Sequence, residues 1–223
     1  MCFSATASFI SGTVLIPAGI YCLITAIRKQ RHTWPLALVP MVFGIQQFSE
    51  GFVWHGIEHG DPALTRSASL VFLFIAQAFW PFWFLFLSAT HDPRPRARIL
   101  FSFLSLASTF WFWVLFLPLA TGPEAMLTTR VVHHSIVYEF TGLVILDYVP
   151  RAVLRLLYFL CVALPMVFGP ESFGRLPGLV LGILAVFTII VFNYAFLSVW
   201  CFFAAIMSAY LCWHYYTMGK VVV

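Results

Sequence analysis

The run His55-Gly56-Ile57-Glu58-His59 has the residue types and the spacing of a metal site. It matches the H-x-x-E-H pattern, in which two histidines bind zinc and the glutamate acts as a general base. Residues four apart on a helix share a face, so His55 and His59 can bind one ion. The run stops beside the helix-breaking Gly60-Asp61-Pro62, and the alternative is a solvated cluster at a helix end. We therefore predict a metal site, with zinc as the ion, at His55, Glu58 and His59.

A second group of polar residues comes directly before this run. At about 100° per residue of a helix, Gln47, Glu50 and Trp54 fall on one stripe, with Gln46 beside them. An ionised glutamate near the centre of a bilayer costs on the order of 3 kcal/mol, so a Glu50 within a membrane helix is paired, protonated or functional. We predict that Glu50 is a catalytic acid or base, and that Gln46, Gln47, Trp54 and Arg155 bind a ligand.

Arg155 is the predicted partner of Glu50. Arg151 and Arg155 stand one helical turn apart at the start of a later apolar run, at a depth similar to that of Glu50. An ion pair between Glu50 and Arg155 lowers the cost of inserting either charge. The alternative is that the pair only fixes helix packing, because buried ion pairs serve both purposes.

The cysteines leave several chemistries open. Their number, five, is odd, and most of them lie in apolar runs, which argues against a disulfide framework. Cys2 and Cys201 are predicted catalytic residues that could also form a disulfide or bind a soft metal such as copper. The alternative is that both thiols are small packing residues. His133 and His134 could supply one further metal ligand, because neighbours on a strand point to opposite faces.

The elements that must position these residues are membrane helices. Of 223 residues, 62% are hydrophobic and 9% are charged, a combination that is rare in soluble domains of this size. About 20 apolar residues cross a bilayer. We therefore predict an all-α, polytopic bundle of about seven transmembrane helices, at about 9–27, 34–56, 67–89, 99–120 and 150–168, with the run 178–216 broken near Asn193-Tyr194 into a sixth and a seventh.

The distribution of Lys and Arg predicts the topology. One set of loops holds eight of them and the other set four, so the N-terminus is expected outside and the C-terminus in the cytoplasm. The opening has no basic segment typical of a signal peptide, and we expect the first span to be retained. The connection 121–148 is then a long extracytoplasmic loop, in which the β-branched run 130–138 favours a hairpin. We expect a single transmembrane domain spanning 1–223.

Three stretches of the sequence are distinctive. They are the opening Met1-Cys2-Phe3-Ser4-Ala5-Thr6-Ala7-Ser8-Phe9, the central Gln46-Gln47-x-x-Glu50-Gly51-x-x-Trp54, and the late run 198–205, Ser-Val-Trp-Cys-Phe-Phe-Ala-Ala. Together they resemble a group of bacterial integral-membrane proteins classed as a domain of unknown function. The resemblance implies no activity. It implies a place in the bacterial inner membrane and a shared pattern that includes Cys2, Glu50, Trp54 and Cys201, whereas His55 and His59 fall outside that pattern.

Two classes of function remain open. The first is an outward-facing site around Glu50 that binds a metal or catalyses a reaction. The second is a non-enzymatic sensor, transporter or accessory subunit, with the lipid bilayer as its surroundings and a second copy or another membrane protein as its partner. Nucleic acid is excluded as a partner, since the basic residues are scattered between spans. The sequence also has no glycine-rich phosphate loop.

Overall fold

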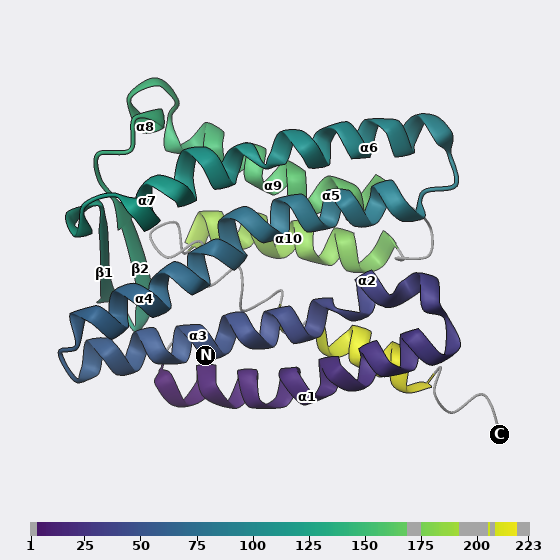
Figure 1. The fold of residues 1–223 in the computed structure, drawn as a ribbon, viewed down its shortest axis with the longest axis horizontal. Coiled ribbons are helices and arrows are strands. Elements are labelled where there is room, and N and C mark those ends of the chain that lie inside the picture. Colours follow the sequence, from purple (N-terminus) through teal and green to yellow (C-terminus); the bar gives the residue numbers. More distant parts are fainter. Residues whose placement is uncertain (1–3, 169–174, 192–204, 206–207, 218–223) are drawn as a thin grey trace. The chain divides into compact units, whose positions relative to one another are not determined.

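The computed structural model describes residues 4–168, 175–191, 205 and 208–217. Its regular elements are almost all helical, which confirms the all-α prediction (Figure 1). The α-helices are α1 (Ala5–Lys29), α2 (Trp34–Ala37), α3 (Val39–Glu58), α4 (Pro62–Leu73), α5 (Trp80–His91), α6 (Pro95–Ser108), α7 (Leu117–Thr121), α8 (Ile145–Tyr148), α9 (Arg151–Phe168) and α10 (Arg175–Val191). Between them lie the 3₁₀-helices η1 (Arg31–Thr33) and η4 (Glu124–Met126), the π-helices η2 (Phe74–Phe79) and η3 (Phe112–Phe116), and the strands β1 (Leu127–Val132) and β2 (Ser135–Phe140).

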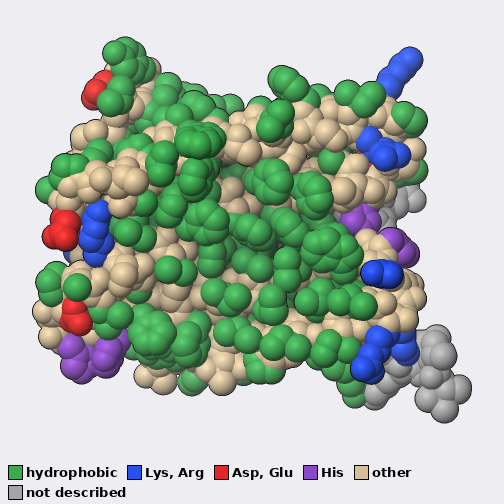
Figure 2. All heavy atoms as spheres, viewed as in Figure 1, with side chains coloured by type: hydrophobic (Ala, Val, Ile, Leu, Met, Phe, Trp, Pro, Cys, Tyr) green, Lys and Arg blue, Asp and Glu red, His purple; other side chains and the backbone are tan. Residues whose placement is uncertain are grey.

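Within the described residues, five helical segments are long and apolar enough to cross a membrane. They are Ala5–Lys29, Arg31–Glu58, Pro62–His91, Pro95–Thr121 and Arg151–Phe168. These agree with the first five predicted spans, extended at most ends by a few residues. The break near Asn193-Tyr194 lies outside the described residues, so the number seven and the orientation stay predictions. Figure 2 shows hydrophobic side chains over most of the face in view, with charged side chains near helix ends.

The chain groups into two compact units. Unit 1 comprises Met1–Phe72, Val131–Val137 and Ala195–Val223, and unit 2 comprises Leu73–Arg130 and Tyr138–Tyr194. Unit 1 contains α1, α3 and α4, and unit 2 contains α5, α6, α9 and α10. The single-domain expectation stays a prediction.

In unit 1, α1 and α3 run side by side at backbone contact (Figure 1). Glycines make this approach possible, because a methyl group at any of them would collide with the facing helix. A Cβ on Gly12 would lie 2.9 Å from the Gly44 carbonyl oxygen, and one on Gly44 would lie 2.8 Å from the Ile16 nitrogen. Small residues let membrane helices approach closely in this way. The contact therefore fixes the rotation of α3 about its axis.

The turn between α3 and α4 is built from the predicted helix-breaking residues. Gly60 has φ +65°, a left-handed conformation that glycine adopts at little cost. The Asp61 N–H donates to the Gly56 carbonyl at 2.8 Å, and the Gly60 N–H donates to the Ile57 carbonyl at 3.3 Å. Asp61 then caps α4, since its Oδ1 accepts from the Leu64 N–H at 2.9 Å. The sequence predicted the end of this helix correctly.

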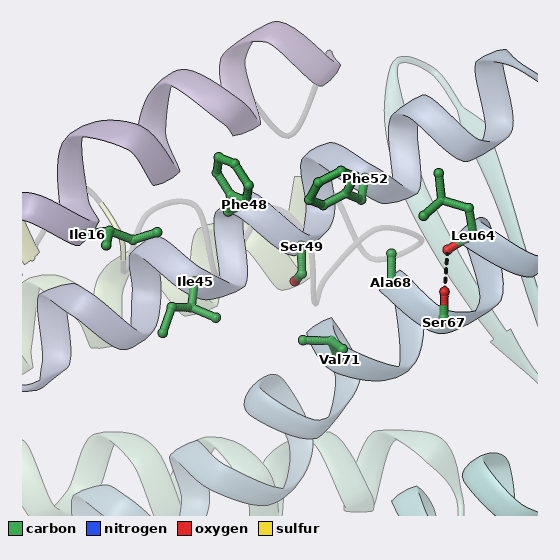
Figure 3. Close-up of a pocket in the computed structure, with 9 residues that line it drawn as sticks. All are labelled: Ile16, Ile45, Phe48, Ser49, Phe52, Leu64, Ser67, Ala68 and Val71. Carbon is green, nitrogen blue, oxygen red and sulfur yellow. Dashed lines mark hydrogen bonds between the residues drawn. The ribbon is translucent and has the colours of Figure 1, made fainter.

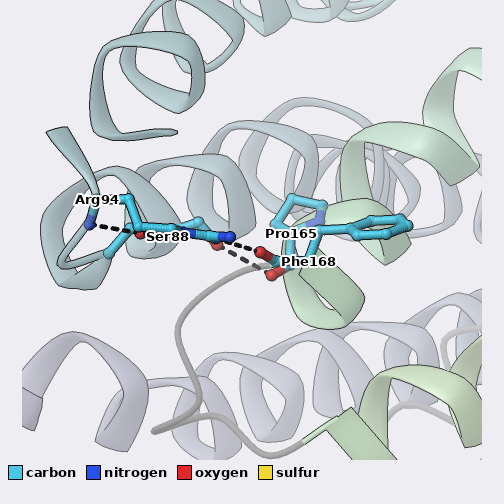
Figure 4. A network of polar contacts seen from close by, with 5 residues as sticks. Ser88, Arg94, Pro165 and Phe168 are labelled. Carbon is cyan, nitrogen blue, oxygen red and sulfur yellow. Dashed lines mark hydrogen bonds and ion pairs between the residues drawn. The ribbon is translucent and has the colours of Figure 1, made fainter. Parts of the chain in front are cut away.

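In unit 2, hydrogen bonds connect the end of α5 and the turn that follows it to the end of α9 (Figure 4). Asp92 is buried and pairs with Arg94, whose Nε and terminal nitrogen lie 2.9 and 2.6 Å from its two carboxylate oxygens. Arg94 also donates to the carbonyl of Phe168, the last residue of α9, at 2.6 Å. One turn earlier, the Ser88 hydroxyl donates to the Pro165 carbonyl at 3.1 Å. Arg94 thus supplies a donor to a carbonyl at a helix end, where intrahelical partners are missing.

Each π-helix ends two residues before a proline. In η2 the Trp80 N–H bonds to the Ile75 carbonyl, five residues back. The next bond of that series would join Ala76 to Pro81, which has no N–H. The Tyr158 hydroxyl of α9 donates to the Ala76 carbonyl at 2.7 Å and so replaces the missing bond. The same spacing recurs in η3, which precedes Pro118.

The predicted hairpin is present in the connection 121–148, with β1 paired to β2. Its turn is His133-His134, with φ 46° and 58°. Two consecutive left-handed residues form the tight turn whose twist suits a two-residue hairpin. The expectation that these histidines lie on a strand and point to opposite faces was wrong, because both are in the turn.

The first prediction concerns the α1–α3 contact. A Cβ on Gly19 would collide with the backbone of Met41, which cannot move like a side chain. Gly19→Ala should lower the free energy of unfolding by about 1–3 kcal/mol, as expected for overpacking. The measurement is the thermal unfolding midpoint in detergent. Gly182→Ala is the matched control, because its Cβ would meet the nearest atom, Cζ of Phe159, at an ordinary 3.9 Å. Equal midpoints for the two variants would contradict the packing described above.

The second prediction concerns pH. Arg94, mainly by its hydrogen bond to Asp92, holds the pKa of that carboxyl below its usual value. The folded chain therefore binds fewer protons than the unfolded chain as the pH falls through the ordinary aspartate value of about 3.9, and stability is lost on acidification. Denaturation midpoints between pH 6 and pH 3 should fall less steeply for Asp92→Asn. The exposed Asp147→Asn is the control, and a wild-type slope in Asp92→Asn would refute the assignment.

Candidate functional site

One face of α3 carries a row of buried polar side chains. Gln46, Gln47 and Glu50 are 0% exposed, and Trp54 is 5% exposed. Val53 and Phe43 lie on the same side of the helix and are also buried. The sequence predicted this stripe from its spacing, and the structure buries all of it. We call Gln46, Gln47, Glu50 and Trp54 the polar face of α3.

The polar face is turned away from the helices that pack on α3 in unit 1. α1 meets α3 at Gly44, Phe48 and Gly51, and a Cβ on Gly51 would lie 2.7 Å from the Phe9 ring. α4 meets it at Gly56, where a Cβ would lie 2.5 Å from the Thr65 hydroxyl. At 100° per residue, these contacts fall on other sides of the helix than Glu50. Close packing on two sides therefore fixes the direction of the polar face.

The side chains of Gln47 and Trp54 are incompletely hydrogen-bonded within the described residues. Gln47 Nε2 donates to Glu50 Oε2 at 3.5 Å, the far limit of such a bond. Gln47 Oε1 and the indole N–H of Trp54 are buried and have no hydrogen-bond partner within the described part of the chain. A buried polar atom without a partner costs about 1–3 kcal/mol. The face therefore has an acceptor and a donor to offer, one on either side of the Glu50 carboxyl.

The two residues of the predicted Glu50–Arg155 pair belong to different units. Glu50 belongs to unit 1, and Arg155, half-buried on α9, belongs to unit 2. The ion pair therefore stays a prediction. Cys2 and Cys201, the other predicted catalytic residues, lie outside the described residues.

The residues of the H-x-x-E-H pattern are exposed at the end of α3. The rings of His55 and His59 have centroids 4.0 Å apart, and His59 Nδ1 lies 2.9 Å from the His55 carbonyl. Glu58 is exposed beside them. Among the residues that the structure describes, no group of three or more His, Cys, Asp or Glu could hold a metal. The structure thus brings the two histidines together without showing a third ligand from another element.

Two features of the fold were not anticipated from the sequence. Gln77, in the π-helix η2 of unit 2, is 5% exposed, and its Oε1 has no hydrogen-bond partner among the described residues. An amide inside the long apolar run 67–89 was the available signal. The second feature is an apolar groove between α1, α3 and α4. The periodicity of the sequence does not identify the residues that line it.

The groove has a volume of about 410 Å³ and lies within unit 1 (Figure 3). Its lining comprises Ile16, Ile45, Phe48, Ser49, Phe52, Leu64, Ser67, Ala68 and Val71. Both hydroxyls in it already donate to carbonyls of their own helices, Ser49 to Gln46 at 2.7 Å and Ser67 to Ala63 at 2.9 Å. The groove therefore presents an apolar surface, in contrast to the polar face of α3.

An exposed ion pair joins the two strands of the hairpin in the connection 121–148. The Arg130 guanidinium lies 2.5 Å from the Glu139 carboxylate. Its hydrogen bond to Glu139 raises the pKa of Arg130 above its usual value. Cross-strand pairs of opposite charge stabilise a hairpin by a few tenths of a kcal/mol to about 1 kcal/mol. The pair gives Arg130 and Glu139 a structural role, so neither charge needs to be assigned to a functional site.

Comparison with known proteins gives a family but no characterised relative. A family model described as "Family of unknown function (DUF6629)" matches residues 1–220. No curated protein and no solved structure matches the chain.

The third prediction tests the H-x-x-E-H pattern by elemental analysis of the purified protein. If His55 and His59 bind zinc, near-stoichiometric zinc should copurify with the wild type and be lost in His55→Ala and in His59→Ala. His91→Ala is the matched control, since His91 also stands at the end of a helix, α5. Zinc that is retained in both variants, or absent from the wild type after growth with added zinc, would contradict the metal assignment.

Proposed function

We propose that this chain, which belongs to the DUF6629 family, a family of unknown function, is a multi-pass protein of the bacterial inner membrane that binds a small polar ligand at the polar face of α3. The binding serves sensing or transport. On the predicted topology of seven spans, with the N-terminus outside, the site opens toward the outer side of the membrane.

One observation carries the proposal: Gln47 Oε1 and Trp54 Nε1 are buried and have no hydrogen-bond partner within the described residues. Seven residues separate them, roughly 10 Å along a helix. A ligand that donates to Gln47 and accepts from Trp54 would recover the free energy that these atoms lose on burial. Its size would be that of a small organic molecule with hydrogen-bonding groups at both ends.

Glu50 stands between these two atoms and gives the site its charge. As a carboxylate it accepts from Gln47 Nε2 and attracts a cationic or donor group of the ligand. As a neutral acid it could instead donate to Gln47 Oε1 after the amide turns over, since a protonated carboxyl gains an O–H donor. Binding of a cationic ligand would then release the proton. This exchange would couple ligand binding to protonation.

The same face gives less support to the enzyme alternative. Catalysis by acid and base groups commonly uses two groups of different pKa, or a nucleophile beside a base. Glu50 is the titratable side chain among the described residues of this face. Cys2 or Cys201 would have to supply the second group, and both lie outside the described residues.

The fourth prediction tests ligand binding with the full-length protein in detergent. Amino acids, polyamines, sugars and alkali cations are screened for probes that raise the thermal midpoint of the wild type. Glu50→Gln and Trp54→Phe should weaken the binding of such a probe roughly tenfold to hundredfold, because a hydrogen bond to a charged group contributes about 1.5–3 kcal/mol. Glu124→Gln is the control, an exposed glutamate that lies outside α3.

Two outcomes would overturn the proposal. One is a probe that binds Glu50→Gln and Trp54→Phe as tightly as the wild type. The other is the absence, in infrared spectra of the wild type between pH 5 and pH 9, of any carboxyl band that Glu50→Gln lacks. Together with the absence of a bound probe, this result would mean that the face binds neither ligand nor proton.

A further inference from the structure

Two cysteines that are distant in the sequence meet within unit 1. Cys22 lies in the middle of α1 and is 0% exposed, and Cys212 lies in the helical stretch 208–217 and is half-buried. The Cys212 side chain packs against the buried cluster that contains Cys22. Both are free thiols in this structure. Neither cysteine belongs to the polar face of α3.

The surrounding side chains hold the two thiols in place. Cys22, Ala26, Ala37 and Tyr215 form one buried cluster, against which Cys212 packs. Tyr215, one turn from Cys212, donates its hydroxyl to the Thr33 carbonyl at 3.1 Å. This bond anchors the stretch 208–217 to the connection that follows α1. The approach of the thiols is thus fixed by a packed cluster and a hydrogen bond between elements.

Two thiols in one packed cluster need only a small movement to reach the bond length of a disulfide. We propose that Cys22 and Cys212 are a reversible thiol–disulfide site that is oxidised by hydroperoxides. Cys212 is the first thiol to react, because it is the more exposed of the two.

The reaction balances in two steps. The Cys212 sulfur attacks the peroxide, the O–O bond breaks, a sulfenic acid forms, and an alcohol or water leaves. The Cys22 sulfur then attacks the sulfenic sulfur, the S–S bond forms, and water leaves. The two electrons lost by the sulfurs reduce the peroxide. A dithiol reverses the oxidation by thiol–disulfide exchange.

On the predicted topology, the pair of thiols lies toward the cytoplasmic side of the membrane. Cys22 is seven residues from Lys29 at the end of α1 that is expected to face the cytoplasm. Disulfides on that side of the membrane are usually transient and redox-sensing, because cytosolic reductants keep thiols reduced. The pair is therefore expected to be reduced at rest and to close under peroxide stress, joining α1 covalently to the stretch 208–217.

The fifth prediction uses the full chain with Cys2, Cys161 and Cys201 replaced by Ser, so that Cys22 and Cys212 are the remaining thiols. Membranes are treated with hydrogen peroxide, quenched with N-ethylmaleimide and analysed by intact mass and peptide mapping. We expect a loss of two hydrogen masses, a peptide that links Cys22 to Cys212, protection of both thiols from alkylation, and reversal by dithiothreitol. Wild-type protein, mapped in the same way, guards against misfolding of the multiple variant.

The controls distinguish a specific pair of thiols from a general reactivity of cysteines toward peroxide. On the same background, Cys22→Ser should leave Cys212 as a sulfenic acid or a higher oxide, with no linked peptide. Cys161, a half-buried thiol of α9 in unit 2, should form no link to either cysteine in the wild type. If peroxide leaves both thiols open to alkylation in the folded protein, or if the link forms only after unfolding, the proposal is wrong.

Discussion

The backbone contact between α1 and α3 determines where the chemistry of unit 1 can lie. Gly12, Gly19 and Gly44 let the two helices approach until backbone meets side chain or backbone, and a rotation of α3 would push atoms into this contact. The direction of Glu50 and its polar neighbours is therefore set by glycines on another side of the helix. Packing among small residues thus directs the carboxyl into the interior.

The sequence predicted those parts of the fold that local rules control. The period of 3.6 residues placed Gln47, Glu50 and Trp54 on one stripe, and the left-handed Gly60 ends α3 where a breaker was expected. The hairpin also followed from a β-branched run. His133 and His134 were misplaced because this tight turn needs two consecutive residues in the left-handed conformation. That conformation is uncommon for residues other than glycine, and the β-branched run gave no sign of it.

What the sequence could not predict depends on contacts between distant segments. Nothing in the spacing of Cys22 and Cys212 distinguishes them from the half-buried Cys161, yet only folding makes the first two neighbours. The burial of the Glu50 face was expected from composition, but the two atoms there without partners became visible only with the side chains in place. The predicted Glu50–Arg155 pair is a further case, since its two residues belong to different units.

Tyr158 in one helix replaces a hydrogen bond that is missing from another helix. Pro81 removes one backbone donor from the third span, and the Tyr158 hydroxyl on α9 fills the vacancy at the Ala76 carbonyl. The residue types at positions 81 and 158 are therefore expected to depend on each other. A relative that loses the proline regains the N–H and no longer needs the hydroxyl, so phenylalanine becomes acceptable at position 158. Covariation of positions 81 and 158 among relatives would record this dependence.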